Sequence, residues 1–512
     1  MLKKVFGSAV FGVEATTITV EVNVDGGIGY HLVGLPDNAI KESNYRIAAA
    51  LQNNGYKIPG KKITINMAPA DLRKEGSSYD LTLAIGILAA SNQIQAENLE
   101  KYLIMGELSL DGSLQPIKGS LPIAIKARQE GFEGFILPSQ NAREAAIVSD
   151  LKVFGVDNIK QVIHYFDKGE PLEQTIINTR EEFEKNLDFP EHDFSDVRGQ
   201  EGIKRCMEIA AAGGHNIILI GPPGAGKTML AKRLPSILPP MTLHEALETT
   251  KIHSVVGRVQ AHTGLMAQRP FRSPHHTISD VALVGGGAFP QPGEISLSHN
   301  GVLFLDELPE FKRGVLEVLR QPLEDREVTI SRAKFTVTYP SSFMLVASMN
   351  PSPGGYFNDP NAPVTSSPAE MQRYLSKISG PLLDRIDIHI EVTPVPFEKL
   401  SEDRKGETSV EIRKRVTKAR QIQTERFKES DAVHYNAQMN TKQIRKYCIL
   451  DEPSKQLLKT AMERLNLSAR AYDRILKVSR TIADLEGVEE VNGSHISEAI
   501  QYRSLDREGW LG

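Results

Sequence analysis

Cysteine is nearly absent from this chain of 512 residues, in which only Cys206 and Cys448 are present. Two cysteines exclude a disulfide framework and a four-cysteine metal site. Such low usage is typical of proteins that work in a reducing compartment. We therefore expect a cytoplasmic protein.

Long hydrophobic runs are also missing. No apolar stretch approaches the roughly 20 residues that a membrane-spanning helix needs, so we expect no membrane association. The first residues, up to Val13, faintly resemble a signal peptide, but Glu14 ends the apolar run early and no small-residue cleavage site follows. We interpret this stretch as a first β-strand.

A strong charge of either sign is lacking as well, since the formal net charge is −4. This value gives no global sign of a nucleic-acid-binding protein. It does not exclude one, because a motor that grips DNA in a central pore needs only a local basic lining.

The length predicts two to four domains in a multidomain α/β protein. Residues 1–170 alternate strand and helix signals, as in an α+β or α/β domain. Residues 171–195 are polar and charged, so we interpret them as a linker whose acidic run is a solvated helix face. Residues 196–395 indicate a parallel α/β core, and the helix-rich residues 396–512 indicate a lid.

A glycine-rich loop lies between a short apolar strand and the start of a helix. It consists of Gly221, Pro222, Pro223, Gly224, Ala225, Gly226, Lys227 and Thr228. In this context the pattern predicts a phosphate-binding loop whose backbone N–H groups surround phosphate oxygens. Lys227 is expected to bind the β- and γ-phosphates of a nucleotide, and the Thr228 hydroxyl to ligate Mg²⁺; a kinase, a GTPase or a pump could carry such a loop.

Two later strands deliver polar side chains to the same sheet edge. The apolar strand from Gly301 ends in Asp306 and Glu307. We expect Asp306 to hold Mg²⁺ and Glu307 to polarise the attacking water. The strand from Ser342 ends at Asn350, whose amide is expected to contact the γ-phosphate or position the water.

Two arginines are candidates for stabilising the transferred phosphoryl group. Arg385 is a candidate arginine finger, although an ion pair with Asp384 or Asp387 at the helix end is the alternative. Arg470, near the start of a predicted helix, is placed to reach phosphate, and Arg474, one turn on, is its alternative.

These motifs, in this order, resemble those of AAA+ ATPases, and more closely the clade that contains the magnesium chelatase ATPase subunit and the MCM helicases. The specific resemblance, over nearly the whole chain, is to the YifB/ComM family of magnesium-chelatase-like bacterial proteins. Four stretches carry it: His31 to Asp37, Asn66 to Leu72, Arg269 to His276 and Ser379 to Asp387.

The resemblance implies an N-terminal Lon-protease-like (S5-type) domain, an AAA+ core, a helical lid and assembly into a homo-hexameric ring. It implies an ATP- and Mg²⁺-dependent motor on branched or single-stranded DNA, with helicase or branch-migration activity in recombination or natural transformation. A chelatase-like or protein-remodelling chaperone ATPase is the alternative, and an ATP-dependent Lon-like protease is a third possibility.

The resemblance also implies roles for single residues. Asn350 matches sensor 1, Arg385 the arginine finger and Arg470 sensor 2. After a helix predicted over 311–325, residues 328–337 have two β-rich arms around a basic tip. In this clade such a hairpin points into the pore, so Arg332 and Lys334 are predicted to contact DNA phosphates; a solubilising hairpin tip is the alternative.

The stretch from Arg269 to His276 contains two arginines and two adjacent histidines. We expect it to form a second DNA-facing or intersubunit loop. Metal ligation is disfavoured, because adjacent histidines point apart in a strand and no cysteine or carboxylate stands beside them.

Two departures from the family pattern bear on function. Ser78 stands where Lon-type proteases have their nucleophile, but Leu121 stands at the place of the catalytic lysine, and Lys118 lies three residues earlier. A serine without a nearby base is a poor nucleophile, so we predict a non-proteolytic domain. Many relatives carry cysteine pairs after Asn350; here cysteine is absent through to Gly380, so no zinc is expected.

Overall fold

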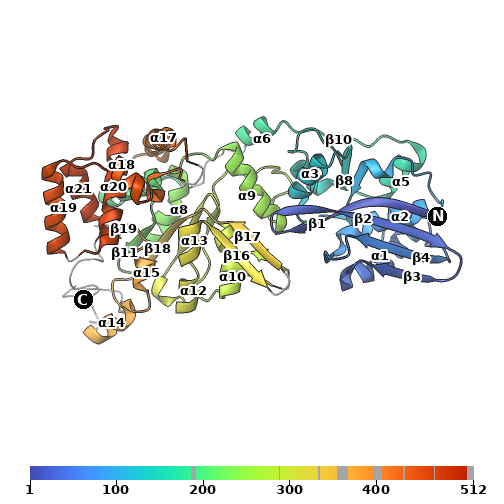
Figure 1. Cartoon of the computed structure of the whole chain (residues 1–512), viewed down its shortest axis with the longest axis horizontal. Helices are drawn as coiled ribbons and strands as arrows, with labels where there is room; N and C mark the ends of the chain where they lie inside the picture. Colours follow the sequence, from blue (N-terminus) through green and yellow to red (C-terminus); the bar gives the residue numbers. More distant parts are fainter. Residues whose placement is uncertain are drawn as a thin grey trace.

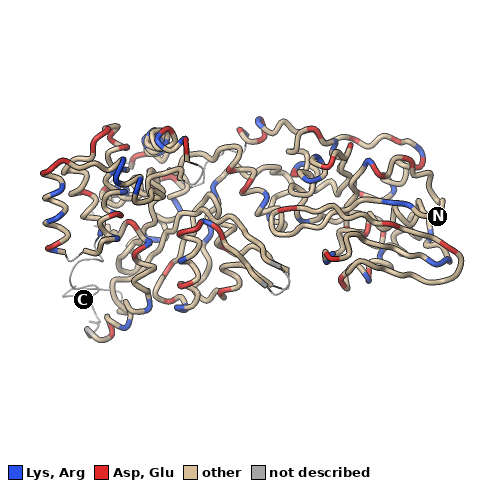
Figure 2. Tube along the Cα trace, in the orientation of Figure 1, with Lys and Arg blue, Asp and Glu red and all other residues tan. Residues whose placement is uncertain are grey.

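The computed structural model describes residues 1–185, 192–287, 289–332, 335–354, 367–395, 406–430, 433–465 and 467–503. The molecule is elongated, with the N-terminal sheet at one end and the C-terminal helices at the other (Figure 1). Basic and acidic residues are interspersed along the trace (Figure 2). Among the helices of these ranges, none combines the length and apolar sequence required to span a bilayer.

The N-terminal part is built on a mixed eight-stranded sheet in the order β10-β9-β8-β5-β1-β2-β4-β3. The strands are β1 (Leu2–Phe11), β2 (Glu14–Asp25), β3 (Gly29–Val33), β4 (Lys62–Ala68), β5 (Tyr102–Ile104), β8 (Gly134–Pro138), β9 (Lys152–Val156) and β10 (Gln174–Thr175). In β2 every second side chain from Ile18 to Val24 is buried, as its alternating sequence predicts. A turn at Asp111-Gly112 joins β6 (Glu107–Leu108) and β7 (Leu114–Gln115), which pair antiparallel.

Five helices pack against this sheet: α1 (Asn38–Asn53), α2 (Asp80–Ala90), α3 (Ser120–Gln129), α4 (Ser139–Ala145) and α5 (Ile159–Lys168). Every residue of α2 is buried, as its apolar sequence predicts. Asp37 caps α1 by accepting a hydrogen bond from Ile40 N at 2.8 Å. The cap fixes where the helix begins after the stretch that follows β3.

The segment after the N-terminal sheet differs in part from the prediction. β10 adds an edge strand to the sheet, and α6 (Thr179–Lys185) follows it. The interpretation of the acidic run as a solvated face is wrong for Glu182, which is buried and pairs with Arg143 (Nη2 to Oε2, 2.9 Å). A buried carboxylate needs such a partner.

The second part is built on a five-stranded parallel sheet in the order β12-β15-β18-β11-β19. Its strands are β12 (Phe271–Arg272), β15 (Val302–Leu305), β18 (Met344–Met349), β11 (Ile217–Ile220) and β19 (Ile388–Glu391). Three of them, β11, β15 and β18, are buried at every position, which is why they are continuous apolar runs in the sequence. The helices α7 (Glu201–Gly213), α8 (Lys227–Ile237) and α9 (Leu243–Val255) flank this sheet or extend from it.

The segment between β15 and β18 contains a further difference. Instead of one helix over 311–325 there are two short ones, α12 (Arg313–Glu317) and α13 (Arg320–Asp325). Pro322 explains the break, because a proline ring collides with the carbonyl four residues earlier, here that of Val318. The predicted hairpin is present as β16 (Glu327–Arg332) and β17 (Phe335–Pro340). The side chain of Arg332 and the whole of Lys334 lie outside the described residues.

The C-terminal part is helical, as predicted. Its helices are α17 (Ser409–Arg426), α18 (Thr441–Tyr447), α19 (Glu452–Arg464), α20 (Ala469–Glu486) and α21 (Gly493–Gln501). Asn492 caps α21 by accepting hydrogen bonds from Ser494 N and His495 N. Apolar side chains of α17 and α20 share one buried cluster with α7 and α8, so these helices are packed onto the part of the molecule that contains the parallel sheet.

Helix α9 connects the two halves. It packs against α3 of the N-terminal part, and the Gly119 N–H donates to the carbonyl of Ser254 at 2.9 Å. Three apolar residues of the central part, Met241, Ala246 and Leu265, belong to the N-terminal core cluster. The interface is therefore a continuous packed one.

Candidate nucleotide-binding site

The glycine-rich loop joins the end of β11 to the start of α8. Gly224 and Gly226 have φ of +79° and +89°, in the left-handed region that favours glycine. At Gly221 a Cβ atom would lie 2.2 Å from the carbonyl oxygen of Val392, so no side chain fits there. The loop conformation thus depends on glycine at three of its eight positions.

Lys227 points back into this loop. Its Nζ donates to the carbonyl oxygens of Gly221 (2.6 Å) and Pro222 (3.0 Å) and to Oδ1 of Asn350 (3.1 Å). The side chain is largely buried, which lowers the pKa of its ammonium, while Asp306 and Glu307 oppose that shift. Lys227 begins α8 after β11 and Asn350 follows β18, and the two meet because β11 and β18 are neighbours in the sheet.

The end of β15 supplies the carboxylates. The Thr228 hydroxyl donates to Oδ2 of Asp306 at 2.9 Å. The other carboxylate oxygen accepts from the Ser348 hydroxyl and from the backbone N–H of Glu307, the latter at 3.1 Å. Asp306 is thereby held in one orientation beside the first turn of α8.

Glu307 has an unusual backbone for a non-glycine residue, with φ of +55°. Such conformations cost free energy and persist where the surroundings impose them. Here Ser348 Oγ accepts from the Glu307 N–H at 3.2 Å. The side-chain carboxylate remains half exposed, and its Oε2 lies 3.8 Å from Nδ1 of His276.

These groups surround one cavity of about 390 Å³. It is lined by Pro223, Gly224, Ala225, Gly226, Lys227, Thr228, Met229, Asp306, Glu307, Ser348, Met349 and Asn350. The structure therefore places the phosphate loop, both carboxylates and Asn350 around a single space.

The cavity fits a nucleoside triphosphate with a divalent cation. The first N–H groups of α8 have no carbonyl partner within the helix, so they are free to donate to phosphate oxygens. The Thr228 hydroxyl and the Asp306 carboxylate, already in contact, are the hard oxygen donors that Mg²⁺ prefers. Within the described ranges, no group of three or more metal-ligating side chains is present, so the remaining ligands would be phosphate and water.

Several side chains that sequence reasoning missed support this site. Ser348 holds Asp306 and Glu307, as described above. Tyr374 donates to the carbonyl of Asn350 at 3.2 Å, and the Gln200 amide donates to the carbonyls of Ala225 (3.1 Å) and Thr393 (3.0 Å). Ser348 lies two residues before Asn350 on β18, so the period of two would have placed it on the same face. No local signal marks Tyr374 or Gln200.

Arg385 does not line this cavity. Its guanidinium pairs with Glu324 on α13 and donates to the carbonyl of Pro381 at 2.5 Å. Its alternative interpretation named Asp384 or Asp387 as the partner, and the structure shows neither in that role.

Those two aspartates pair with arginines of α20 instead. Arg470 of α20 pairs with Asp384, and Arg474 pairs with Asp387 (Nη1 to Oδ1, 3.0 Å). Neither arginine lines the cavity at the phosphate loop. Burial would raise the pKa of Asp387, but Arg474 and His215 outweigh it and lower that pKa well below its usual range.

The stretch from Arg269 to His276 makes contacts within the chain. Arg269 pairs with Glu245 (3.4 Å) and Arg272 with Glu294 (2.5 Å). The expectation that the adjacent histidines point apart is wrong: the rings of His275 and His276 lie 4.1 Å apart between centroids. The residues leave the short strand β12 before the histidines, so strand alternation does not apply.

In the N-terminal part, Leu121 is fully buried at the start of α3, where its N–H donates to Glu144 at 3.1 Å. Ser78 lies in a short 3₁₀ helix, and its carbonyl accepts from the Gly106 N–H at 2.7 Å. The side chain of Lys118 packs over Gly257 of the central part. Among the described residues, no hydrogen bond joins an amine to the Ser78 hydroxyl.

The stretch after Asn350, where relatives carry cysteine pairs, is described only up to Gly354 and again from Ser367. The prediction about zinc therefore concerns residues that lie largely outside the described ranges.

The parallel sheet, the phosphate loop and the carboxylates at the neighbouring strand end fit a nucleotide-binding core of the AAA+ type. Sequence comparison agrees with this class. The family described as "Magnesium chelatase, subunit ChlI" matches residues 193–400, "Subunit ChlI of Mg-chelatase" matches 20–141, and "Magnesium chelatase, subunit ChlI C-terminal" matches 406–503.

Two relatives match over almost their whole length. Competence protein ComM of Haemophilus influenzae is 46% identical over 98% of this chain and 97% of that protein. YifB of Escherichia coli is 44% identical over 98% of this chain and 96% of its own. The chain therefore belongs to the YifB/ComM family of magnesium-chelatase-like proteins.

Partial similarities extend to two other proteins. Lon protease 2 of Bacillus subtilis is 30% identical over 28% of this chain and 27% of its own length. DNA replication licensing factor mcm7 of Schizosaccharomyces pombe is 24% identical over 40% of this chain and 25% of its own.

Proposed function

We propose that this protein is an ATP-hydrolysing ring motor that acts on branched or single-stranded DNA, with helicase or branch-migration activity in recombination or natural transformation. The observation that carries the ATPase part is the single cavity formed by Lys227, Thr228, Asp306, Glu307 and Asn350. The DNA part rests on the family, on the name of its competence relative and on the basic tip of the β16–β17 hairpin, where Arg332 and Lys334 would contact phosphates.

In this mechanism ATP would supply the phosphoryl group, and Mg²⁺ would supply the positive charge that neutralises it. Lys227 exchanges its carbonyl contacts for phosphate oxygens, while Thr228 and Asp306 hold the cation. Glu307 orients a water and accepts its proton as the water attacks, and the Asn350 amide fixes that water or the γ-phosphate. The strained backbone of Glu307 and its contact with Ser348 hold the base at the strand end.

We further propose that the site is completed in a homo-hexamer. Arg385 lies outside the cavity of its own chain, and a guanidinium so placed can serve a neighbour's nucleotide as an arginine finger. Arg470 would act as sensor 2. Arg474, which pairs with the buried Asp387, would hold α20 in place.

The proposed domains are a Lon-like, non-proteolytic domain (1–170), a linker (171–195), the AAA+ core (196–395) and the lid (396–512). A cytoplasmic location and the absence of zinc and membrane association belong to the same proposal.

A chelatase-like or protein-remodelling ATPase is the second candidate, because the matched family profiles carry the magnesium chelatase name. A protease is the weakest, because apolar Leu121 is buried where the catalytic lysine would stand.

The decisive experiment measures ATP turnover of the full chain with and without forked or four-way DNA, together with strand movement. We expect stimulation by DNA, and Glu307→Gln should bind ATP yet hydrolyse it at least ~100-fold more slowly, since only water activation is removed. Absence of both stimulation and strand movement would refute the DNA motor. Co-purification of a substrate-carrying subunit would favour the chaperone.

A mixing experiment tests the shared site. Arg385→Ala subunits lack the finger and Lys227→Ala subunits lack the phosphate-binding lysine, so each alone should be inactive. Mixed rings should regain part of the activity, because some interfaces combine an intact loop with an intact finger. Complete failure to complement would argue against a site shared between subunits.

A further inference from the structure

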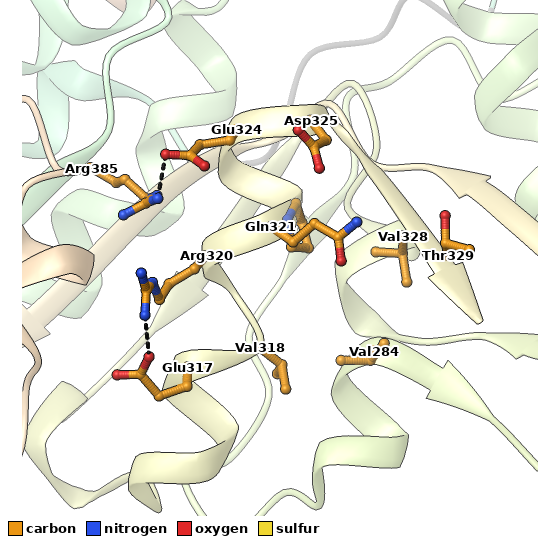
Figure 3. Close-up of a pocket in the computed structure, with 11 residues that line it drawn as sticks. Val284, Glu317, Val318, Arg320, Gln321, Glu324, Asp325, Val328, Thr329 and Arg385 are labelled. Atoms are coloured by element: carbon orange, nitrogen blue, oxygen red, sulfur yellow. Dashed lines mark hydrogen bonds and ion pairs between the residues drawn. The ribbon is translucent and has the colours of Figure 1, made fainter. Parts of the chain in front are cut away.

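A second cavity, of about 450 Å³, lies between α12, α13, β16 and the segment that carries Arg385. Figure 3 shows two arginines on its wall, each paired with a glutamate: Arg385 with Glu324, and Arg320 with Glu317 at 2.9 Å. The first cavity is the proposed nucleotide site, and this one contains the proposed finger.

The two members of the Arg385–Glu324 pair are held very differently. The side chain of Arg385 is only 11% exposed and is fixed by its hydrogen bond to the Pro381 carbonyl, whereas that of Glu324 is 60% exposed at the end of a short helix. Among the described residues, Nε of Arg385 is buried and has no hydrogen-bond partner. The guanidinium is therefore rigid and incompletely satisfied, and its counter-ion is free to rotate into solvent.

The charge on the cavity wall also matters. Three carboxylates, those of Glu317, Glu324 and Asp325, face two guanidinium groups. A triphosphate approaching Arg385 would meet net repulsion unless one carboxylate withdrew. Glu324 is the one that occupies the guanidinium itself, so its departure both removes a negative charge and opens the donors of Arg385.

We propose that Glu324 is a resting counter-ion that covers Arg385 until the terminal phosphates of a nucleotide held by a second copy of this chain replace it. The inference rests on the proposed function, in which Arg385 acts on a neighbour's nucleotide. Glu324 is a positioning residue that sets how readily subunits form the shared site. The exchange is favourable because charge-assisted bonds from a fixed arginine to phosphate are stronger than an exposed ion pair.

The test measures ATP turnover by the full chain as a function of protein concentration at saturating ATP and Mg²⁺. Glu324→Gln should reach half-maximal specific activity at about two- to fivefold lower protein concentration, the range that the loss of a competing exposed ion pair implies. Its maximal turnover should stay within about twofold of the unmodified protein.

Glu317→Gln is the matched control, because it removes one negative charge from the same wall but leaves the pair at Arg385 intact. It should not shift the concentration curve. A curve for Glu324→Gln that matches this control, or that moves to higher concentration, would overturn the proposal, as would a fall in maximal turnover. Thermal melting verifies that both variants fold; the side chain of Glu324 is 60% exposed and that of Glu317 is 33% exposed.

Arg385→Ala separates this inference from the proposed function. If that variant keeps full activity, the finger itself is wrongly assigned. If it is inactive while Glu324→Gln behaves like Glu317→Gln, the finger remains and only the counter-ion role fails.

Discussion

Two lysines in different parts of the molecule are buried to a similar degree yet serve different ends. Lys227 in the phosphate loop is 8% exposed and Lys74 in the N-terminal part is 0% exposed. Both donate to backbone carbonyl oxygens of loops, Lys227 to Gly221 and Pro222, and Lys74 to Gly34 (3.0 Å) and Pro69. Burial lowers the pKa of both.

The difference lies in what surrounds the ammonium group. Lys227 stands on the wall of an open cavity with Asp306 and Glu307 close by, so its carbonyl partners are replaceable by an anion. Lys74 is enclosed by the chain it binds, and it joins the loop after β3 to the loop after β4. A buried lysine is thus a ligand-binding group only where a cavity gives the ligand access; elsewhere it is a cross-link between backbone segments.

The largest expected effect separates the two roles. Lys227→Ala should lower ATP turnover by at least ~100-fold, because the charge that contacts the phosphates is removed. Melting temperature should change little, since the cavity lets water reach the freed carbonyls. Lys232→Ala, at an exposed position of the same helix, is the control and should retain activity. Comparable ATP turnover in Lys227→Ala and Lys232→Ala would contradict the role that distinguishes Lys227 from Lys74.

A third buried lysine tests the cost of burial through pH. Lys477 in α20 donates to the Ala437 carbonyl at 2.9 Å, and burial lowers its pKa from 10.5 to about 8. Between these values the unfolded chain binds more protons than the folded one, so stability rises as pH rises from 8 to 10.5. From pH 8 to 10.5 the free energy of unfolding should rise by on the order of 3 kcal/mol more in the unmodified protein than in Lys477→Met. Hydrogen exchange of α20 measures this difference. Parallel profiles of stability against pH in the unmodified protein and Lys477→Met would contradict this prediction.

Lys74→Met examines the cross-linking role. It leaves the Gly34 and Pro69 carbonyls without their donor, which we expect to lower the local opening free energy by about 1–3 kcal/mol. Faster hydrogen exchange in β3 and β4 would report this, while ATP turnover stays within about twofold. The exposed Lys57→Met should leave exchange unaltered. If Lys74→Met instead abolished ATP turnover while hydrogen exchange in β3 and β4 stayed unaltered, the two lysines would not differ as described.

The smallest expected effect concerns Ser78. Ser78→Ala should change ATP turnover by less than about twofold and leave casein intact, as in the unmodified protein, because the serine has no base to accept its proton. Its carbonyl contact with Gly106 remains in the variant. Casein digestion by the unmodified protein that disappears in Ser78→Ala would support the protease alternative.

Much of the fold could be predicted because its signals are local. Apolar strands ending in polar residues, the glycine-rich loop and the cap of α21 are each encoded within a few residues, and the structure contains all of them. The prediction of a single helix over 311–325 is wrong, because the ring of Pro322 collides with the carbonyl of Val318. The burial of Glu182 was missed because its partner, Arg143, is distant in sequence.

The sequence by itself determined which groups meet at the phosphate loop, because parallel strands bring their carboxyl ends to one edge whatever else surrounds them. Only the tertiary structure decided the partners of the arginines and the supporting contacts of Ser348, Tyr374 and Gln200. It also showed that Lys74 is buried and joins the loops after β3 and β4, a role that no sequence pattern indicated. Charge pairing and access to solvent depend on segments far apart along the chain, and no local pattern encodes them.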